Sequence, residues 1–296
     1  MTTIWVHAGG MREVIDTRQP ALVEEAVKAD YRAMFPQGNP EFITQIFGWF
    51  QSWFDGRYKD FQPIDAHYHD GEHTLQGELC MTRLLRAYQA RGKEPVLTQR
   101  LFELGMLAML LHDTGYLKKR GDKEGTGAKY TLTHVDRSIE FAGELMLSNE
   151  FAVEEILAVQ NMIRCTGVNV KLDTIQFQSP GERIVGFALG TADLLGQMAA
   201  PDYVDKLPIL YSEFAEAASF SDAKMRVGGF FSSADDLMQK TPLFWEKYVL
   251  QKINRDFLGL YRFLNDPYPD GPNPYIGQIE ANMMRLHRDL ASRNKR

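Results

Sequence analysis

The sequence contains only two cysteines, Cys80 and Cys165, among its 296 residues. Two cysteines without CxxC spacing suggest neither a disulfide framework nor a thiolate zinc site. The longest apolar runs fall short of the roughly 20 residues that a membrane span needs. Residues Met1–His7 also lack the basic and apolar regions of a secretion signal. These absences favour a soluble protein of the reducing cytoplasm, with no membrane partner.

Basic residues are outnumbered by acidic ones. The chain has 33 Lys and Arg against 39 Asp and Glu, and it has no basic run beyond Lys118-Lys119-Arg120. Such a balance gives no electrostatic footprint for duplex nucleic acid. We therefore do not expect duplex nucleic acid as the main partner. A homodimer is one option for the oligomeric state.

Convincing strand patterns are also missing. Apolar residues recur at helical spacing almost throughout, and period-two alternation bounded by turn residues is hard to find. With 44% hydrophobic residues the chain can bury a large core, so we expect one all-α domain over residues 1–296. The expected helices cover residues 20–34, 41–55, 72–91, 98–112, 134–147, 153–165, 182–198, 202–217, 234–264 and 277–292.

Three further segments stand out by composition. Residues 118–133, rich in Gly and Lys, and residues 266–275, rich in Pro and Gly, are expected to form ordered loops, and the first of them could act as a lid. Residues 42–54 are unusually aromatic. We expect this segment to pack on the core, because aromatic side chains dominate core packing and the basic residues of a membrane-surface helix are absent. A dimer contact is the alternative.

The strongest chemical signal is the pair His112-Asp113, which ends the apolar run Leu101–Leu111. An imidazole and a carboxylate at the buried end of such a run are costly to desolvate unless something binds them, and a metal ion is a common answer. Asp193 lies inside a second apolar stretch, and His73 lies upstream of both. His73, His112, Asp113 and Asp193 together form a set of four nitrogen and oxygen ligands.

The segment Tyr68–Thr74 carries two histidines, His69 and His73, that are four residues apart. On the first turn of a helix they would share one face. The HEXXH motif of zinc proteases has the same spacing, but it needs a glutamate directly after the first histidine. Here that position is Asp70, and the glutamate precedes the second histidine, so the zinc-protease interpretation fails.

An upstream His, an adjacent His-Asp and a distant Asp in an Ala-Asp-Leu context occur here in an order that resembles the HD-domain superfamily of metal-dependent phosphohydrolases. The resemblance covers about residues 65–200. It implies an HD-domain/PDEase-like helical bundle as the core of the chain. The N-terminal helices within residues 20–55 and the C-terminal helices within residues 202–292 would then pack on that core.

Within this superfamily, Tyr68–Thr74 is similar to the Tyr-His-Asn-x-x-His-Ala segment of cyclic-nucleotide phosphodiesterases, with Asp70 in place of the family's Asn. The similarity implies that His73 is a metal ligand and that His69 is a proton donor. The predicted function is therefore metal-dependent hydrolysis of a phosphoester by a hydroxide that the metal activates. The similarity favours a nucleotide or cyclic nucleotide as the substrate, and a small phosphomonoester is the alternative.

Downstream, the chain is more similar to bacterial HD and HD-GYP-type proteins, in which a histidine after the dyad serves a second metal. This similarity implies such a role for His134, which could instead cap a helix. The other histidines of a second-metal shell are expected near Gln160–Arg164, where none occurs, and a GYP signature is absent. Two arrangements stay open, a single ion or a second ion held loosely by His134, Asp113 and water.

The ligand types suit Zn, Mn, Fe, Co or Ni at the tight site, with Mg at a second, water-rich site. A basic group near the ligands would neutralise the phosphate oxygens, and we expect Lys118 or Lys119 to do so. Two other functions compete with hydrolysis. One is an HD-fold oxygenase with two irons, and the other is a sensor that binds a metal or a nucleotide without catalysis.

Overall fold

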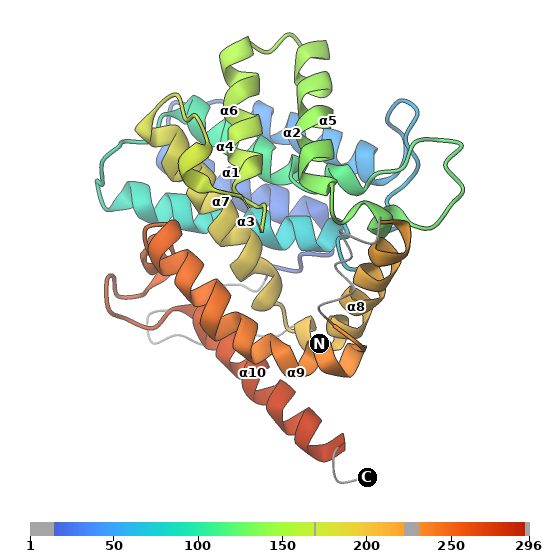
Figure 1. The fold of residues 1–296 in the computed structure, drawn as a ribbon. Coiled ribbons are helices and arrows are strands. Elements are labelled where there is room, and N and C mark those ends of the chain that lie inside the picture. The colour runs from blue at the N-terminus through green and yellow to red at the C-terminus, as the bar shows by residue number, and fades with distance from the viewer. Residues whose placement is uncertain (1–14, 169, 222–230, 294–296) are drawn as a thin grey trace.

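The chain is helical in the part that the structure describes. This computed structural model describes residues 15–168, 170–221 and 231–293, so Met1–His7 lies outside the described residues (Figure 1). The described residues contain no β-strand beyond an isolated bridge between Phe61 and Lys119. The all-α prediction is confirmed. The α-helices are α1 (Pro20–Met34), α2 (Glu41–Phe54), α3 (Gly71–Ala90), α4 (Gln99–Leu111), α5 (His134–Ser148), α6 (Val153–Arg164), α7 (Pro180–Met198), α8 (Tyr203–Phe220), α9 (Ala234–Phe244) and α10 (Pro274–Arg293).

Several helices begin at polar side chains that accept a free backbone N–H of the first turn. The side chain of Asp70 accepts from the N–H of His73 at 2.9 Å, and the side chain of Thr98 accepts from the N–H of Leu101 at 3.2 Å. Such caps satisfy donors that have no partner within the helix. They fix the starts of α3 and α4 within one residue of the expected positions.

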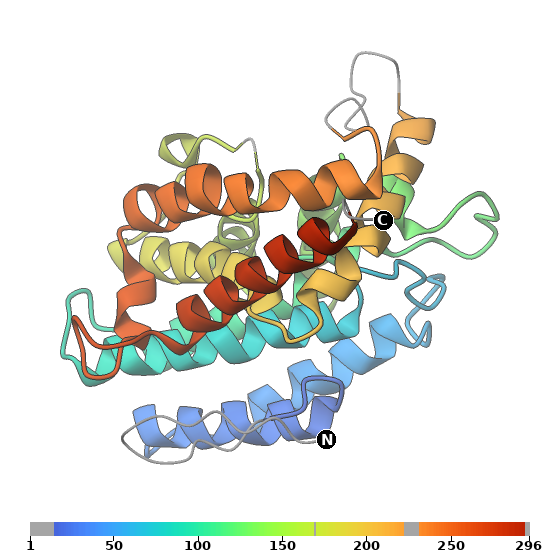
Figure 2. The ribbon, with the colours of Figure 1, turned by 90° about the horizontal axis from the view of Figure 1, so that it is seen from below.

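Helices α3 and α7 pack along each other at the centre of the molecule. Helices α1 and α2 form a layer beside α3, whereas α9 and α10 lie on the other side of the α3–α7 pair (Figure 2). Helices α5 and α6 stand side by side as a projecting hairpin (Figure 1). All ten helices contribute buried apolar side chains to one cluster. The described helices therefore share a single core.

Glycine allows α3 and α7 to approach closely. A Cβ atom on Gly196 of α7 would lie 2.8 Å from backbone atoms of Gln76 and Gly77 of α3, which is too close for any side chain. Gly196 lies one turn beyond Asp193, and Gln76 lies one turn beyond His73. The close approach at this point therefore brings those two candidate ligands together.

The single helix expected over residues 234–264 is wrong. Helix α9 ends at Phe244, two π-helical segments (Trp245–Val249 and Lys252–Asp256) follow, and left-handed backbone at Gly259 precedes a short 3-10 helix. The buried apolar residues between positions 245 and 257 are spaced four apart: Trp245, Val249, Ile253 and Phe257. A strict four-residue repeat drifts around an α-helix of 3.6 residues per turn, and the wider π-turns keep it on one face.

Two other expectations concern surface segments. Helix α2 buries Phe47, Trp53 and other apolar residues in the shared core, which confirms that this aromatic segment packs on the core. The loop over residues 118–133 is ordered and includes a 3-10 helix, Gly127–Tyr130. Its Thr126 hydroxyl donates to Glu216 of α8 at 2.8 Å. The predicted lid role is not tested by these contacts.

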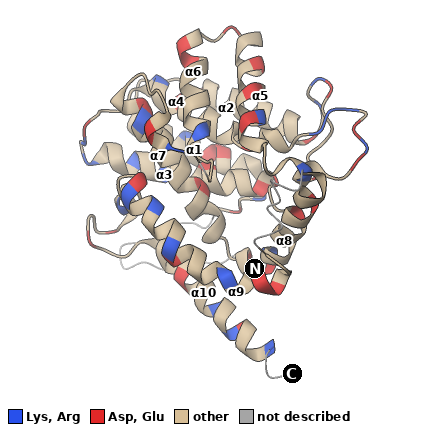
Figure 3. Ribbon diagram, in the orientation of Figure 1, with Lys and Arg blue, Asp and Glu red and all other residues tan. Residues whose placement is uncertain are grey.

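Charged residues of both signs are interspersed over the helices (Figure 3). None of the helices in the described ranges combines the length and the apolar composition that crossing a membrane requires.

We predict that Gly196→Ala destabilises the protein by about 1–3 kcal/mol, because the added methyl group overpacks the α3–α7 contact. Gly48→Ala is the matched control, since Gly48 is exposed on α2 and an added Cβ would contact nothing within 4 Å. The control should be neutral or stabilising by up to about 1 kcal/mol, because alanine favours the helix. Urea unfolding of both variants measures the difference, and a Gly196→Ala protein as stable as the wild type would contradict it.

Candidate metal centre

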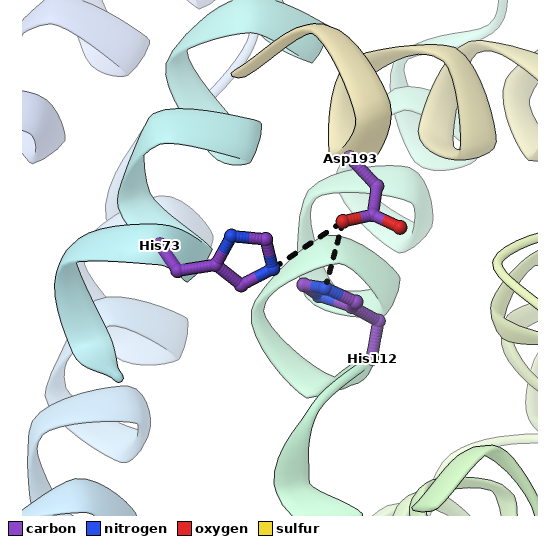
Figure 4. A group of neighbouring side chains, drawn as sticks. All are labelled: His73, His112 and Asp193. Atoms are coloured by element: carbon purple, nitrogen blue, oxygen red, sulfur yellow. Dashed lines mark ion pairs between the residues drawn. The ribbon is translucent and has the colours of Figure 1, made fainter. Parts of the chain in front are cut away.

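Four predicted ligands meet at one point between α3, α4 and α7. The Nε2 atom of His73 lies 3.2 Å from Asp113 Oδ2 and 3.3 Å from Asp193 Oδ1. The Nε2 atom of His112 lies 3.3 and 3.6 Å from the same two oxygens. Figure 4 shows the two imidazoles and Asp193 pointing toward one another from three helices. The sequence prediction that these four residues form one group agrees with this geometry.

The group is withdrawn from solvent. His73, His112 and Asp113 are each at most 4% exposed, and Asp193 is the more open member. Asp113 Oδ2 and His112 Nε2 are buried without a hydrogen-bond partner among the described residues. Buried polar atoms are normally paired, so unpaired atoms that face one another call for an explanation. A cation between them would provide one.

The chain around His112 shows which form of the imidazole is present. His112 directly follows the last residue of α4, and its Nδ1 lies 2.7 Å from the carbonyl oxygen of Met109. Since a carbonyl can only accept, Nδ1 carries a proton. Nε2 then presents its lone pair to two carboxylates unless a second proton or a metal ion lies between them.

The spacing of the donor atoms fits a divalent ion. Ligands about 2.1 Å from a metal are separated by about 3.0 Å at a right angle and by about 3.4 Å at a tetrahedral angle. The observed separations between the imidazole nitrogens and carboxylate oxygens range from 3.2 to 3.6 Å. Two imidazoles and two carboxylates also match the ligand preferences of the first-row transition metals. The residues present therefore fit the predicted metal.

His134 occupies the next position outward. It is the first residue of α5, which follows Thr133, so the alternative that His134 caps a helix is wrong. Its Nδ1 lies 2.7 Å from the carbonyl oxygen of Thr131, and its Nε2 lies 3.8 Å from Asp113 Oδ1. Asp113 thus turns one oxygen toward His73 and His112 and the other oxygen toward His134.

Gly115 allows the first residue of α5 to lie close to the 3-10 helix that follows Asp113. A Cβ atom on Gly115 would lie 1.9 Å from the carbonyl oxygen of His134. The N–H of Gly115 donates to the Ser138 hydroxyl at 2.8 Å, which joins the 3-10 helix Thr114–Tyr116 to the first turn of α5. A glycine two residues after Asp113 therefore brings His134 near this carboxylate.

The charges of the group shift its pKa values strongly in the absence of a metal. Burial alone would lower the pKa of His73, but Asp113 and Asp193 outweigh burial and raise it to about 9. The same balance holds the pKa of His112 well above its usual value. Burial would raise the pKa of Asp113, but the two imidazoles keep it well below the usual range. The pKa of His134 is lowered, mainly by burial.

His69 lies beside this group and has a partner that the sequence did not reveal. Its Nδ1 lies 2.6 Å from Oε2 of Glu213, a buried residue of α8. The other oxygen of Glu213 accepts the backbone N–H groups of His67 and Tyr68, both at 2.7 Å. Burial alone would raise the pKa of Glu213, but the hydrogen bond and charge of His69 together with the two backbone N–H groups lower it overall.

One aromatic ring contacts both outer histidines, His69 and His134. The Tyr116 ring stacks against His69 with centroids 4.5 Å apart, and against His134 with centroids 4.8 Å apart. Tyr116 itself is fully buried. Its ring therefore fixes the positions of both imidazoles relative to each other.

The two lysines predicted to contact phosphate have other partners. Lys118 is buried, and its ammonium lies 2.9 Å from Asp65 and donates to the Gly125 carbonyl at 2.6 Å. Lys119 lies with its ammonium 5.7 Å from the Phe61 ring centroid. Neither lysine has a contact with the four ligands among those found in the described residues, and a phosphate contact by either stays a prediction.

We predict that the metal-free protein loses stability as the pH rises from 6.5 to 9. His73 is protonated in the fold below its raised pKa of about 9, whereas its unfolded pKa is about 6.5. Its stabilising charge is fully present below pH 6.5 and is lost as the pH passes 9, on the order of 3 kcal/mol. Urea unfolding in EDTA across this range measures the loss. A flat profile, or the same slope in His73→Asn, would contradict the assignment.

One family model matches the chain, described as Npun_R2479-like, over residues 120–263. The chain is thus similar to this family over just under half of its length. The matched range includes His134, Asp193 and Glu213, and it begins after His73, His112 and Asp113. No curated protein and no solved structure matches the chain.

Proposed function

We propose that this protein is a metal-dependent phosphohydrolase of the HD-domain type that acts on a nucleotide or cyclic nucleotide. The observation that carries the proposal is the convergence of two imidazoles and two carboxylates from three helices, next to a histidine that a buried carboxylate orients. Neither the group of four ligands nor the oriented histidine would indicate hydrolysis by itself. Together they provide a place for a Lewis acid and a proton donor within one buried site.

His73, His112, Asp113 and Asp193 would hold the ion. When bound, such an ion lowers the pKa of water toward neutrality and offsets negative charge on a phosphoryl group. Two of these ligands are preorganised by hydrogen bonds. The Met109 carbonyl fixes the His112 ring, and Gln197 donates to Asp193 Oδ1 at 3.2 Å. Such secondary contacts orient ligands and tune their affinity for the metal.

His69 would protonate the leaving oxygen. The Glu213 carboxylate can only accept, so the hydrogen bond between them places a proton on Nδ1 of His69. Nε2 is then the ring atom left to exchange a proton with a substrate. A general acid of this kind contributes about 100- to 10,000-fold to the rate of a reaction.

A second, weaker ion is a further part of the proposal. His134 Nε2 faces Oδ1 of Asp113, whereas His73 and His112 face Oδ2. The Nδ1 atom of His134 is held by the carbonyl oxygen of Thr131. His134 and Asp113, completed by water, suit Mg or Mn better than a tightly bound ion. Metal titration would then reveal two classes of site, with His134→Asn removing the weaker class alone.

The first experiment combines metal analysis of the purified protein with hydrolysis of bis-p-nitrophenyl phosphate in added Mn, Mg or Zn. Bound metal together with turnover supports the proposal, and nucleotides and cyclic nucleotides are then compared as substrates. Two irons per chain without turnover would favour the oxygenase alternative. Bound metal or nucleotide with no turnover of any phosphoester would favour a sensor.

His69→Asn and Asp113→Asn should separate proton transfer from metal binding. We predict that His69→Asn keeps the metal and lowers kcat by about 100-fold or more, because it removes the proton donor. Asp113→Asn should lose both metal and turnover. His287→Asn is the control, since His287 is exposed on α10. Full activity of His69→Asn would rule out the assigned role.

Glu213→Gln tests how His69 is oriented. The amide keeps the size of the side chain but no longer presents a carboxylate to Nδ1 of His69, so we expect normal metal content and a kcat lowered by about tenfold or more. The pH dependence of kcat should change as well, because the charge next to the proton donor is gone. An unchanged pH profile with a lower kcat would indicate a purely structural effect.

A further inference from the structure

The third candidate ligand histidine differs from the other two in how its ring is held. His112 and His134 each place Nδ1 on a backbone carbonyl three residues earlier, at 2.7 Å. His73 directs Nε2 at Asp113 and Asp193, yet its Nδ1 is buried and has no hydrogen-bond partner in the described part of the chain. A metal-binding histidine almost always donates its other N–H to an acceptor. The described residues supply none.

A small pocket adjoins His73 on α3. Its volume is about 10 Å³, which suffices for one water molecule and little more. The pocket is lined by Tyr68, His73, Gln76, Gln197, Ala200, Tyr203 and Lys206. These residues come from the segment before α3, from α3 itself, from the end of α7, from the connection that follows it, and from the first turn of α8.

Three of the polar groups that line the pocket already have partners. The Tyr68 hydroxyl donates to Gln197 Oε1 at 2.9 Å, and Gln197 donates in turn to Asp193. The Lys206 ammonium lies 3.0 Å from Glu72 and 3.4 Å from Asp202. These groups have little need of a further partner.

The pocket has three other polar groups. They are Nδ1 of His73, which is buried without a hydrogen-bond partner in the described ranges, and the side-chain amide of Gln76 and the hydroxyl of Tyr203, which line the same pocket. Gln76 lies one turn beyond His73 on α3, so the two side chains share a face. Buried waters typically make about three hydrogen bonds to groups that are otherwise unsatisfied. The pocket offers that number around a space of the right size.

We propose that this pocket holds one ordered water molecule that accepts the Nδ1 proton of His73 and is held by Gln76 and Tyr203. The two residues are thereby positioning residues, which fix the orientation and tautomer of His73 through the water. This inference rests on the proposed function in one respect, that His73 is a metal ligand. It does not depend on which substrate is hydrolysed.

Gln76→Met and Tyr203→Phe test the water, because each keeps the size of the side chain and removes one hydrogen bond. We expect each variant to bind Zn about tenfold more weakly, and the double variant more weakly still, in competition with a chromophoric chelator. The kcat for bis-p-nitrophenyl phosphate should recover at saturating metal. Tyr211→Phe is the control on the same helix, since the Tyr211 hydroxyl donates to Ser232 at 3.1 Å, away from the pocket.

Wild-type affinity in both variants and in the double variant would overturn the inference. A crystal structure of the zinc-loaded protein gives a second test, in which density for a water bonded to Nδ1 of His73, Gln76 and Tyr203 is expected and a protein acceptor on Nδ1 would contradict it. Failure of the proposed function looks different, because the wild type would then bind Zn without hydrolysing any phosphoester. A wild type that binds no metal would overturn both proposals.

Discussion

The burial of two carboxylates against two imidazoles is the constraint on which the rest of this structure depends. Removing each charge from water costs several kcal/mol, and pairing alone recovers that cost only when the geometry is good and every polar atom is satisfied. Here His112 Nε2 and Asp113 Oδ2 are unsatisfied within the described residues. Any cation that binds there, a proton or a metal ion, stabilises the fold and the site together. Cation binding at this cluster is therefore linked to the stability of the fold.

The cluster is assembled mainly from helix ends, where the backbone is free to orient side chains. His73 lies in the first turn of α3 behind the Asp70 cap, and His112 directly follows the last residue of α4. Asp113 directly precedes a short 3-10 helix, and His134 begins α5. Gly115 in the 3-10 helix allows the two elements to lie close together. Asp193 is the exception, because it lies within α7 and depends on the close α3–α7 contact to reach the others. Helix packing thus determines the position of one candidate ligand, and local backbone geometry determines the positions of the others.

Much of this arrangement could be predicted from the sequence, and the failures have physical causes. Helical periodicity gave most helix limits within a few residues, and the apolar runs before His112 and around Asp193 marked both as buried. Glu213 carried no such signal, since it lies 144 residues from His69 on an ordinary-looking helix. The same holds for Lys118, whose partner Asp65 is distant in the chain. Over residues 245–257 a four-residue apolar repeat resembled an α-helix, although it requires π-turns.

Helix α8 connects features that the sequence presents as separate. Its residue Glu213 holds His69 and the backbone just before α3, and one turn later Glu216 holds Thr126 of the loop over residues 118–133. The loop is joined at its other side to Asp65, which accepts the N–H of Gly127 at 2.7 Å. A displacement of α8 would therefore move His69 and the loop together. The proposed proton donor and the loop that could act as a lid are therefore held by one helix, because α8 carries both carboxylates.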